Sequence, residues 1–388
     1  MTRVTWEQLA AATLARQFPD DLARGGGPED VAQALDRIGP VQSQTARSPY
    51  LALAARRSGV TYEAVGTTYE DAAIVRGSTL RGTVHTNTPS DHVLLEVATR
   101  LGQRTLWARS LRLDRTTLEQ VWEATETYAR EEWRTPAELH THLRSWLDEH
   151  DPGHGARLDD TAGRYLGFGH GGLLRRPLRG GWEGQGAPGY RAARAVLGDA
   201  AARDAALADP HTALVALVRR HLACHGPASR RDLAWWSGVG LRAVDAALAG
   251  IPGLVTSVAP DGQEVHDLPG MPSGAGAHPA EVVPGVRLLP EFDALLCAYD
   301  PPARTRFVDP EHYRVLWTQE NGLLRSPLLV DGRLTGHWRA EGSGRRRTCV
   351  VTWFAGTRRP RKAEVEEQMA RVATAYPVTW TGLEVVRA

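Results

Sequence analysis

Residues 226–248 read GPASRRDLAWWSGVGLRAVDAAL, and this stretch decides the fold class. Ser229 precedes a short helix that carries Leu233 and two tryptophans, and its hydroxyl can accept a hydrogen bond from the first helical turn. Residues 237–240, with two glycines, predict a turn, and residues 241–248 predict a second helix. Two helices joined by such a turn are typical of a helix-turn-helix.

The segments that flank this motif extend it to a winged helix-turn-helix. Residues 211–221 predict a preceding helix, and residues 254–258 and 264–268 predict two short strands that form a wing. The same order recurs twice upstream, where helices are followed by short extended segments within residues 1–88 and within residues 89–196. The repeated order predicts tandem copies of one module.

The rest of the chain predicts a different kind of domain. Residues 271–285 are rich in glycine, proline and alanine, and the segments beyond them alternate apolar and polar residues between turns. We therefore expect an α+β protein with three tandem winged helix-turn-helix modules followed by a C-terminal β-rich, barrel-like domain. The predicted units are a first module with a glutamine loop at 1–88, a second at 89–196, a third at 197–270, a linker at 271–285 and the β-rich domain at 286–388.

Composition excludes several mechanisms. Among 46 basic residues Lys362 is the only lysine, so chemistry that needs an amine can use only Lys362 or the N-terminal amine. The three cysteines lie far apart and form neither a disulfide framework nor a CxxC metal motif, so we expect no metal and no cofactor. No stretch approaches the roughly 18 apolar residues of a membrane span, and the first residues are unlike a secretory signal. These features predict a soluble, cytoplasmic protein.

The net charge of +1 hides an uneven distribution. Residues 99–115, 164–194 and 338–362 hold five, six and eight basic residues with one acidic residue each, so together they carry +16 and the remainder carries −15. Such basic segments can be solvated surface, or they can form an electrostatic footprint for a polyanion. Three of them together favour a nucleic acid as the partner.

Gln42 and Gln44 stand in the predicted loop between two helices of the first module. In an extended segment, residues two apart point to the same side, so the two carboxamides would converge. Each amide offers one acceptor oxygen and two donor hydrogens, enough to hold a water molecule and also contact a sugar or phosphate. Two glutamines in an exposed loop can equally be structural.

Four segments carry a resemblance to a known family. They are GPVQSQTARSPYLAL at 39–53, LRGTVH at 80–85, RLLPEFD at 287–293 and LVDGRLTGHWR at 329–339. In this order they resemble the AlkZ family of bacterial DNA glycosylases, and the resemblance extends over essentially the whole chain. The sequence departs from the family pattern at Ser43, where the family usually has an aliphatic residue.

The resemblance implies tandem winged-helix modules and a C-terminal β-domain that form a curved scaffold for double-stranded DNA. It implies excision of N7-alkylguanine, including bulky adducts and interstrand crosslinks left by natural-product alkylators, and hence a role in self-resistance and DNA repair. The catalytic glutamine pair of the family matches Gln42 and Gln44.

The implied chemistry is consistent with these residues. Alkylation at N7 makes guanine cationic, so it leaves as a neutral base without a general acid. By analogy with glycoside hydrolysis, the remaining task is to position a water molecule against an oxocarbenium-like sugar. Neutral carboxamides can orient that water, but they stabilise positive charge less than a carboxylate does. The site should therefore act only on activated, cationic lesions.

Further residues are candidates for DNA contacts. Arg47 flanks the glutamine pair and is a candidate for a phosphate contact, and Arg81 and His85 could touch the backbone or the edge of the site. The predicted hairpin tip Arg345, Arg346 and Arg347 could enter a minor groove. The alternatives are a structural salt bridge, a hydrogen-bonded histidine and a solvated turn. Glu291 and Asp293 fit a structural role at a strand end.

The sequence thus predicts a monofunctional DNA glycosylase that acts on N7-alkylguanine in double-stranded DNA. Strand cleavage is not expected, because Lys362 is far in sequence from the glutamines. The alternative is a non-enzymatic winged-helix DNA-binding protein, such as a transcriptional regulator. Regulators usually dimerise to match two half-sites, whereas the sequence has no heptad seam, so we expect a monomer.

Overall fold

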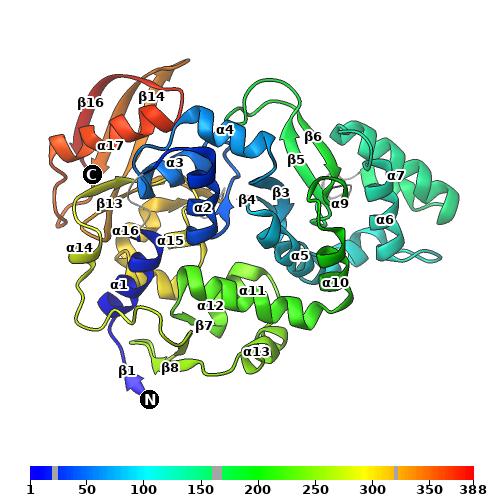
Figure 1. The fold of residues 1–388 in the computed structure, drawn as a ribbon, viewed down its shortest axis with the longest axis horizontal. Helices are drawn as coiled ribbons and strands as arrows, with labels where there is room; N and C mark the ends of the chain where they lie inside the picture. The colour runs from blue at the N-terminus through cyan, green and yellow to red at the C-terminus, as the bar shows by residue number, and fades with distance from the viewer. Residues whose placement is uncertain (20–24, 160–167, 319–321) are drawn as a thin grey trace.

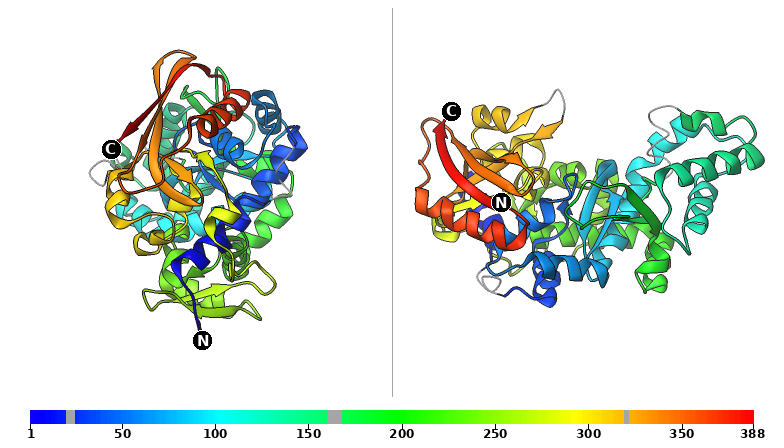
Figure 2. Two further views of the ribbon diagram at one scale, coloured as in Figure 1. Left: turned by 90° about the vertical axis from the view of Figure 1, so that its left-hand side faces the viewer. Right: turned by 90° about the horizontal axis from the view of Figure 1, so that it is seen from above.

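The computed structural model describes residues 1–19, 25–159, 168–318 and 322–388. The molecule is elongated, with the C-terminal sheet at one end and a pair of helices, α6 (Leu118–Tyr128) and α7 (Pro136–His150), at the other (Figure 2). The segments between them form the middle of the body (Figure 1). No helix in these four ranges is long and apolar enough to cross a membrane. Part of the predicted second module, residues 160–167, lies outside the described residues.

The stretch around the tryptophan pair folds in the predicted order of elements. The elements are α11 (Pro210–His225), β7 (Ala228–Ser229), α12 (Arg230–Ser237), α13 (Leu241–Ala249), β8 (Val255–Val258) and β9 (Glu264–Asp267). Ser229 caps α12 in a capping box with Asp232, and Gly238 ends the helix in the left-handed conformation that glycine adopts without strain. Strands β8 and β9 pair antiparallel, and β7 pairs with β9.

The N-terminal residues belong with this stretch in space. Strand β1 (Thr2–Arg3) pairs parallel with β8, so the four-stranded sheet has the order β1-β8-β9-β7. In α1 (Trp6–Gln17), the buried Arg16 forms an ion pair with Asp267 at 2.6 Å. A buried guanidinium needs such a partner. The first 17 residues therefore pack on the third predicted module as well as on their own, since Gln17 also donates to Ile38 and accepts from Arg56.

The first two predicted modules share one sheet. Their elements include α2 (Pro28–Ile38), β2 (Val41–Gln42), α3 (Ser48–Arg56), α4 (Tyr62–Glu70), β3 (Val75–Thr79), η2 (Leu80–Gly82), β4 (Thr83–Asn87), β5 (Leu173–Pro177) and β6 (Pro188–Ala192). The sheet has the order β2-β4-β3-β5-β6, and Gly77 pairs with Leu174 where the two ribbons join. A Cβ atom on Gly77 would lie 2.7 Å from a ring carbon of His92, so only glycine fits at this junction.

Helices carry the chain away from this sheet and back. They are α5 (Pro89–Leu111), α6, α7, η3 (Gly155–Asp159), α9 (Ala193–Val196) and α10 (Ala200–Ala208). Arg203 joins α10 to Glu96 of α5 and Glu126 of α6 with hydrogen bonds of 2.6 to 2.7 Å, and Arg100 pairs with the same two carboxylates. Arg104 pairs with Glu119 of α6. Glu96, Glu119 and Glu126, all outside the basic window 99–115, therefore offset part of its charge.

The C-terminal part is β-rich and curled. Its elements are α14 (Pro279–Val282), β10 (Val286–Leu288), α15 (Ala294–Cys297), η4 (Pro301–Arg306), α16 (Pro310–Leu316), β11 (Trp317–Thr318), β12 (Leu323–Leu324), β13 (Ser326–Val330), β14 (Arg333–Ser343), β15 (Arg346–Trp353), α17 (Lys362–Ala375) and β16 (Thr379–Arg387). The main sheet has the order β10-β13-β14-β15-β16 and forms a half-barrel with β10 and β16 as its edges. The predicted linker holds the helical turn α14, which packs on α1.

The C-terminal part packs directly on the first module. Helix α17 lies between its own sheet and α3, and Leu51 of α3 shares a core with sheet residues such as Val330 and Val351. Below this core, Arg56 forms a fully buried ion pair with Asp293 through two hydrogen bonds of 2.9 and 3.0 Å. The loop that precedes α3 is therefore held against the C-terminal part of the chain. This is the loop with the two glutamines.

Candidate active site

The two glutamines lie at different depths in one loop. Gln42 ends the short strand β2, pairs with His85 of β4 and is only 8% exposed. The next amide, that of Ser43, donates to the carbonyl of Val84 at 2.7 Å, and the chain then turns outward so that Gln44 is exposed. The loop brings the two residues together, but it does not leave two equally accessible carboxamides.

Arg81 lies behind Gln42. Its Nη2 donates to Gln42 Oε1 at 3.1 Å, and its Nη1 donates to the backbone carbonyls of Trp236 and, at 3.4 Å, Trp235. The two carbonyls belong to the C-terminal end of α12, where the helix dipole favours a cation. Arg81 had been expected to contact DNA. The structure places it in a partly buried position where its guanidinium is occupied by protein acceptors.

His85 is buried beneath the loop. It is 2% exposed, and its Nδ1 lies 2.9 Å from the hydroxyl of Thr79. Burial and the neighbouring charge of Arg81 lower the pKa of His85 to about 3, so the imidazole is neutral near pH 7. A neutral, buried ring cannot reach a phosphate from this position. The expectation of a DNA contact at His85 is therefore replaced by a supporting role under Gln42.

Ser43 is accommodated by a buried polar chain. Its hydroxyl lies 2.8 Å from Thr86 Oγ1, which lies 2.6 Å from the hydroxyl of Tyr69, and Arg76 donates to Tyr69 at 3.0 Å. The ring of Tyr69 stacks on Trp182 with centroids 4.2 Å apart. The side chain at position 43 points into the protein, so the departure from an aliphatic residue changes the packing below the loop and leaves the outer surface unaltered.

Arg47 connects the loop to the RLLPEFD segment. Its guanidinium forms an ion pair with Glu291, and the side chain remains 37% exposed. Although burial works in the opposite direction, the hydrogen bond and the charge of Glu291 raise the pKa of Arg47. Glu291 and Asp293 therefore have the structural roles that the sequence suggested, since each pairs with an arginine at one end of α3. Arg47 is partly exposed at the edge of the loop.

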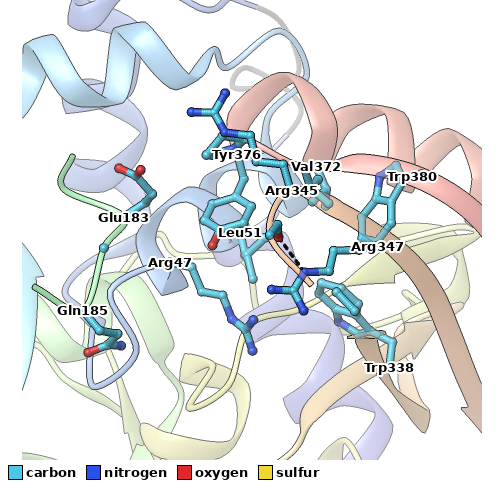
Figure 3. A pocket seen from close by; sticks show the side chains of 15 residues that line it. Arg47, Leu51, Glu183, Gln185, Trp338, Arg345, Arg347, Val372, Tyr376 and Trp380 are labelled. Carbon is cyan, nitrogen blue, oxygen red and sulfur yellow. Dashed lines mark hydrogen bonds between the residues drawn. The ribbon is translucent and has the colours of Figure 1, made fainter. Parts of the chain in front are cut away.

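A cavity of about 370 Å³ opens beside Arg47. Figure 3 shows Glu183 and Gln185 from the β5–β6 connection on one side, and Trp338 and Trp380 from the C-terminal sheet on the other. The indole nitrogens of both tryptophans donate to backbone carbonyls. A ligand would therefore contact the ring surfaces of the two tryptophans. The cavity thus combines aromatic surface with charged and hydrogen-bonding groups.

The predicted arginine tip lies at the rim of this cavity. Arg345 and Arg347 line it, and Arg346 is exposed at the start of β15. Arg347 donates to the carbonyls of Gly342 and Gly344, whereas the side chains of Arg345 and Arg346 form no ion pair or hydrogen bond with any described residue. The sequence suggested this tip as a basic arm, but it gave no indication that the tip lies beside the glutamine loop.

The β5–β6 ribbon supplies residues that sequence reasoning did not identify. A shallow pocket next to Gln44 is lined by Arg175, Arg176 and Gln185, and Gln185 also lines the larger cavity. Arg176 pairs with Glu70, whereas Arg175 has no ion pair with a described residue. The arginine-rich window 164–194 was the available signal. The pairing of β5 with β3, which brings Arg175 to Gln44, could not be read from it.

One group of described residues has the composition of a metal site. Ligand atoms of Asp114, Asp151 and His154 lie within 4.8 Å of one another. Asp151 Oδ2, however, accepts hydrogen bonds from the amides of residues 114–116 and from the hydroxyl of Thr116. Although burial alone would raise it, these bonds lower the pKa of Asp151 to about 2. They account for the cluster as the support of a loop, far in sequence from the glutamines.

Comparisons with known proteins give a family match and a structural match. The model of the DNA glycosylase AlkZ-like family matches residues 35–375. The solved structure of the Streptomyces sahachiroi DNA glycosylase AlkZ resembles the chain with a TM-score of 0.80 at 21% sequence identity, and the match covers 99% of this chain and 100% of that one. A comparison with curated proteins gives no match. The family match includes the glutamine loop, Arg81, the β5–β6 ribbon and the arginine tip.

Proposed function

The chain belongs to the AlkZ-like DNA glycosylase family, and from this premise we propose that it hydrolyses the N-glycosidic bond of N7-alkylguanine in double-stranded DNA. The observation that supports this most is the exposed Gln44, which lines a pocket with Arg175 and Arg176 and lies two residues from the anchored Gln42. The enzyme needs no group that activates the leaving base, because the lesion is already cationic. The family match favours this function over that of a non-enzymatic DNA-binding regulator.

We propose that DNA is held by the unpaired arginines around the loop. Arg175, Arg345 and Arg346 have no ion pair with a described residue, and Arg47 remains partly exposed. Because these residues come from three separate parts of the chain, they can contact the backbone on more than one side of the lesion. The protein acts as a monomer, and the winged-helix order of the segments from α11 to β9 supports duplex binding.

The cavity supports a preference for bulky lesions. Its 370 Å³ exceeds what a methyl group on guanine would occupy, and Trp338 and Trp380 give it aromatic walls. An N7 substituent with a planar ring would gain apolar contact there. We propose natural-product adducts and interstrand crosslinks as substrates, and self-resistance to an alkylating metabolite as the biological role.

The reaction should stop at the abasic site. Lys362, the only lysine, is exposed at the start of α17 and lies 3.7 Å from Glu366, with which it pairs. It does not line the cavity or the pocket next to Gln44. No side-chain amine is therefore available at the glutamine loop to form a Schiff base.

The test is incubation with a duplex that contains 7-methylguanine. We expect free base above the spontaneous rate and strand breaks only after alkali treatment. Because the reaction needs an oriented water, Gln44→Ala should abolish release while the affinity for undamaged duplex stays nearly unchanged. Undiminished release by this variant would overturn the assignment of the site, and breaks before alkali would overturn the absence of lyase activity.

A further inference from the structure

The carboxamide of Gln42 is held in one orientation. A guanidinium has donors and no acceptor, so the Gln42 atom that lies 3.1 Å from Arg81 Nη2 must be the amide oxygen. The opposite orientation would place the amide hydrogens against those of Arg81. The amide nitrogen has no hydrogen-bond partner among the described residues and reaches solvent. Gln42 therefore presents N–H donors to the loop surface.

The side chain of Arg81 is held in one position, although its backbone conformation lowers the stability of the folded protein. Among the described residues no carboxylate pairs with its guanidinium, and burial lowers the pKa of Arg81. Its backbone adopts φ 57° and ψ 20°, a left-handed conformation that is rare for residues other than glycine. The carbonyls at the end of α12 compensate the charge of Arg81, but its backbone strain opposes folding, and strain of this kind concentrates at functional sites.

We propose that Arg81 is a positioning residue that turns the Gln42 amide nitrogen toward the bound nucleotide, so that Gln42 acts as a donor and Gln44 as the acceptor for the hydrolytic water. This inference rests on the glycosylase function proposed above. The two glutamines have the same side chain but different roles, one as a donor and the other as an acceptor. Arg81 affects the reaction by orienting Gln42 and does not contact a phosphate.

The chemistry requires one acceptor for the water. As the C1′–N9 bond breaks, its electron pair neutralises the cationic base, and a C1′–O bond forms to the water oxygen, whose proton passes to solvent. A water that develops positive charge is oriented by an acceptor for its hydrogen. The acceptor of Gln42 is occupied by Arg81, whereas Gln44 is exposed and has no partner among the described residues. The donors of Gln42 can hold the water oxygen or a sugar oxygen.

The first test exchanges each glutamine for glutamate. Gln44→Glu keeps an acceptor where the proposal needs one, and we expect at least about a tenth of the parent rate of 7-methylguanine release under saturating, single-turnover conditions. Gln42→Glu removes both donors and leaves a carboxylate paired with Arg81, and we expect a loss of about 100-fold. Affinity for undamaged duplex is measured separately. Equal losses in the two variants, or the reverse order, would overturn the division of roles.

The second test asks whether Arg81 acts through Gln42. Arg81→Met should lower the saturating rate about 100-fold while DNA affinity changes little, and it should cause no further loss in a Gln42→Ala background, because the group it positions is then absent. Arg304→Met is the matched control. Arg304 is a more deeply buried arginine, 1% exposed, that also donates to Tyr299 and Tyr313, but it makes no contact with Gln42.

The outcomes distinguish a failure of this inference from a failure of the proposed glycosylase function. If the parent releases no 7-methylguanine, or if alanine at both glutamines leaves the rate unchanged, the proposed function fails. If the glutamines matter but Arg81→Met is neutral, or costs the same in both backgrounds, only the role of Arg81 fails. The glutamate exchange leaves Arg81 in place, so it decides the division of roles even if melting experiments find Arg81→Met unfolded.

Discussion

The layer of residues beneath the glutamine loop and the rim of arginines around the loop differ in how far their charged side chains are enclosed and bonded by protein. In the layer, Arg81, His85 and the Arg56–Asp293 pair are largely enclosed by protein, and their polar groups bond to other protein groups. At the rim, the side chains of Arg345 and Arg346 are exposed and form no ion pair or hydrogen bond with any described residue. The difference indicates that the layer sets geometry, whereas the rim supplies charge that is free to meet a polyanion.

The largest expected effect comes from breaking an ion pair of the layer. Asp293→Asn leaves the buried charge of Arg56 without its counter-charge, so the free energy of unfolding should fall by about 3 kcal/mol. Chemical denaturation measures this change. Asp245→Asn is the matched control, because Asp245 pairs with Arg230 on the surface, where both side chains are 46% exposed, and a pair of that kind contributes roughly 0 to 1 kcal/mol. Equal effects in the two variants would contradict the enclosed position of the Arg56–Asp293 pair in the layer.

The sequence could predict the layer only in part. The helix-turn-helix of residues 226–248 was predictable because its cap, apolar spacing and glycine turn are local signals. Gln42 and Gln44 were found by family resemblance, and the structure brings them into one loop. The roles of Arg81 and His85 were not predictable, because burial and the contact with Trp236 depend on segments 155 residues apart meeting in space.

For the rim, the sequence identified the residues but not their positions. Its arginines stood out in the sequence as basic windows, but their arrangement did not. Arg175 reaches the loop only because β5 pairs with β3, and Arg345 only because α17 packs on α3. The predicted division at residues 88 and 196 failed to anticipate the shared sheet for the same reason, since strand pairing between modules leaves no local pattern.

Lowering the pH should also reduce the free energy of unfolding, independently of the ion pair. Burial lowers the pKa of His85 in the layer to about 3, and it lowers the pKa of His221, a buried residue of α11 outside the layer, to about 4, both below the ordinary 6.5. Below about pH 6.5 the unfolded chain therefore binds protons that the folded chain does not, and stability falls as pH decreases toward these lowered values. At about pH 5 each such histidine should cost roughly 2 kcal/mol.

The pH effect is measured by denaturation at neutral pH and at about pH 5. His85→Gln should lose less stability over this interval than the parent, because one proton-binding difference is removed. Constant stability of the parent across the interval would contradict the burial of neutral histidines in the layer.

The smallest effect on the protein itself should come from the rim, where charge can be removed without loss of folding. Arg345→Gln combined with Arg346→Gln should leave the melting temperature nearly unchanged, because neither side chain has a partner to lose. If each arginine contacts one phosphate, the variant should lower the slope of log affinity against log salt by about 2. Arg333→Gln is the control, since Arg333 pairs with Asp309 at 2.7 Å away from the cavity lining. An unchanged salt slope with a reduced rate of base release would mean that the arginine tip acts on the lesion and not on the DNA backbone. The layer would then not be the only region that sets geometry, and the distinction between the layer and the rim would no longer hold.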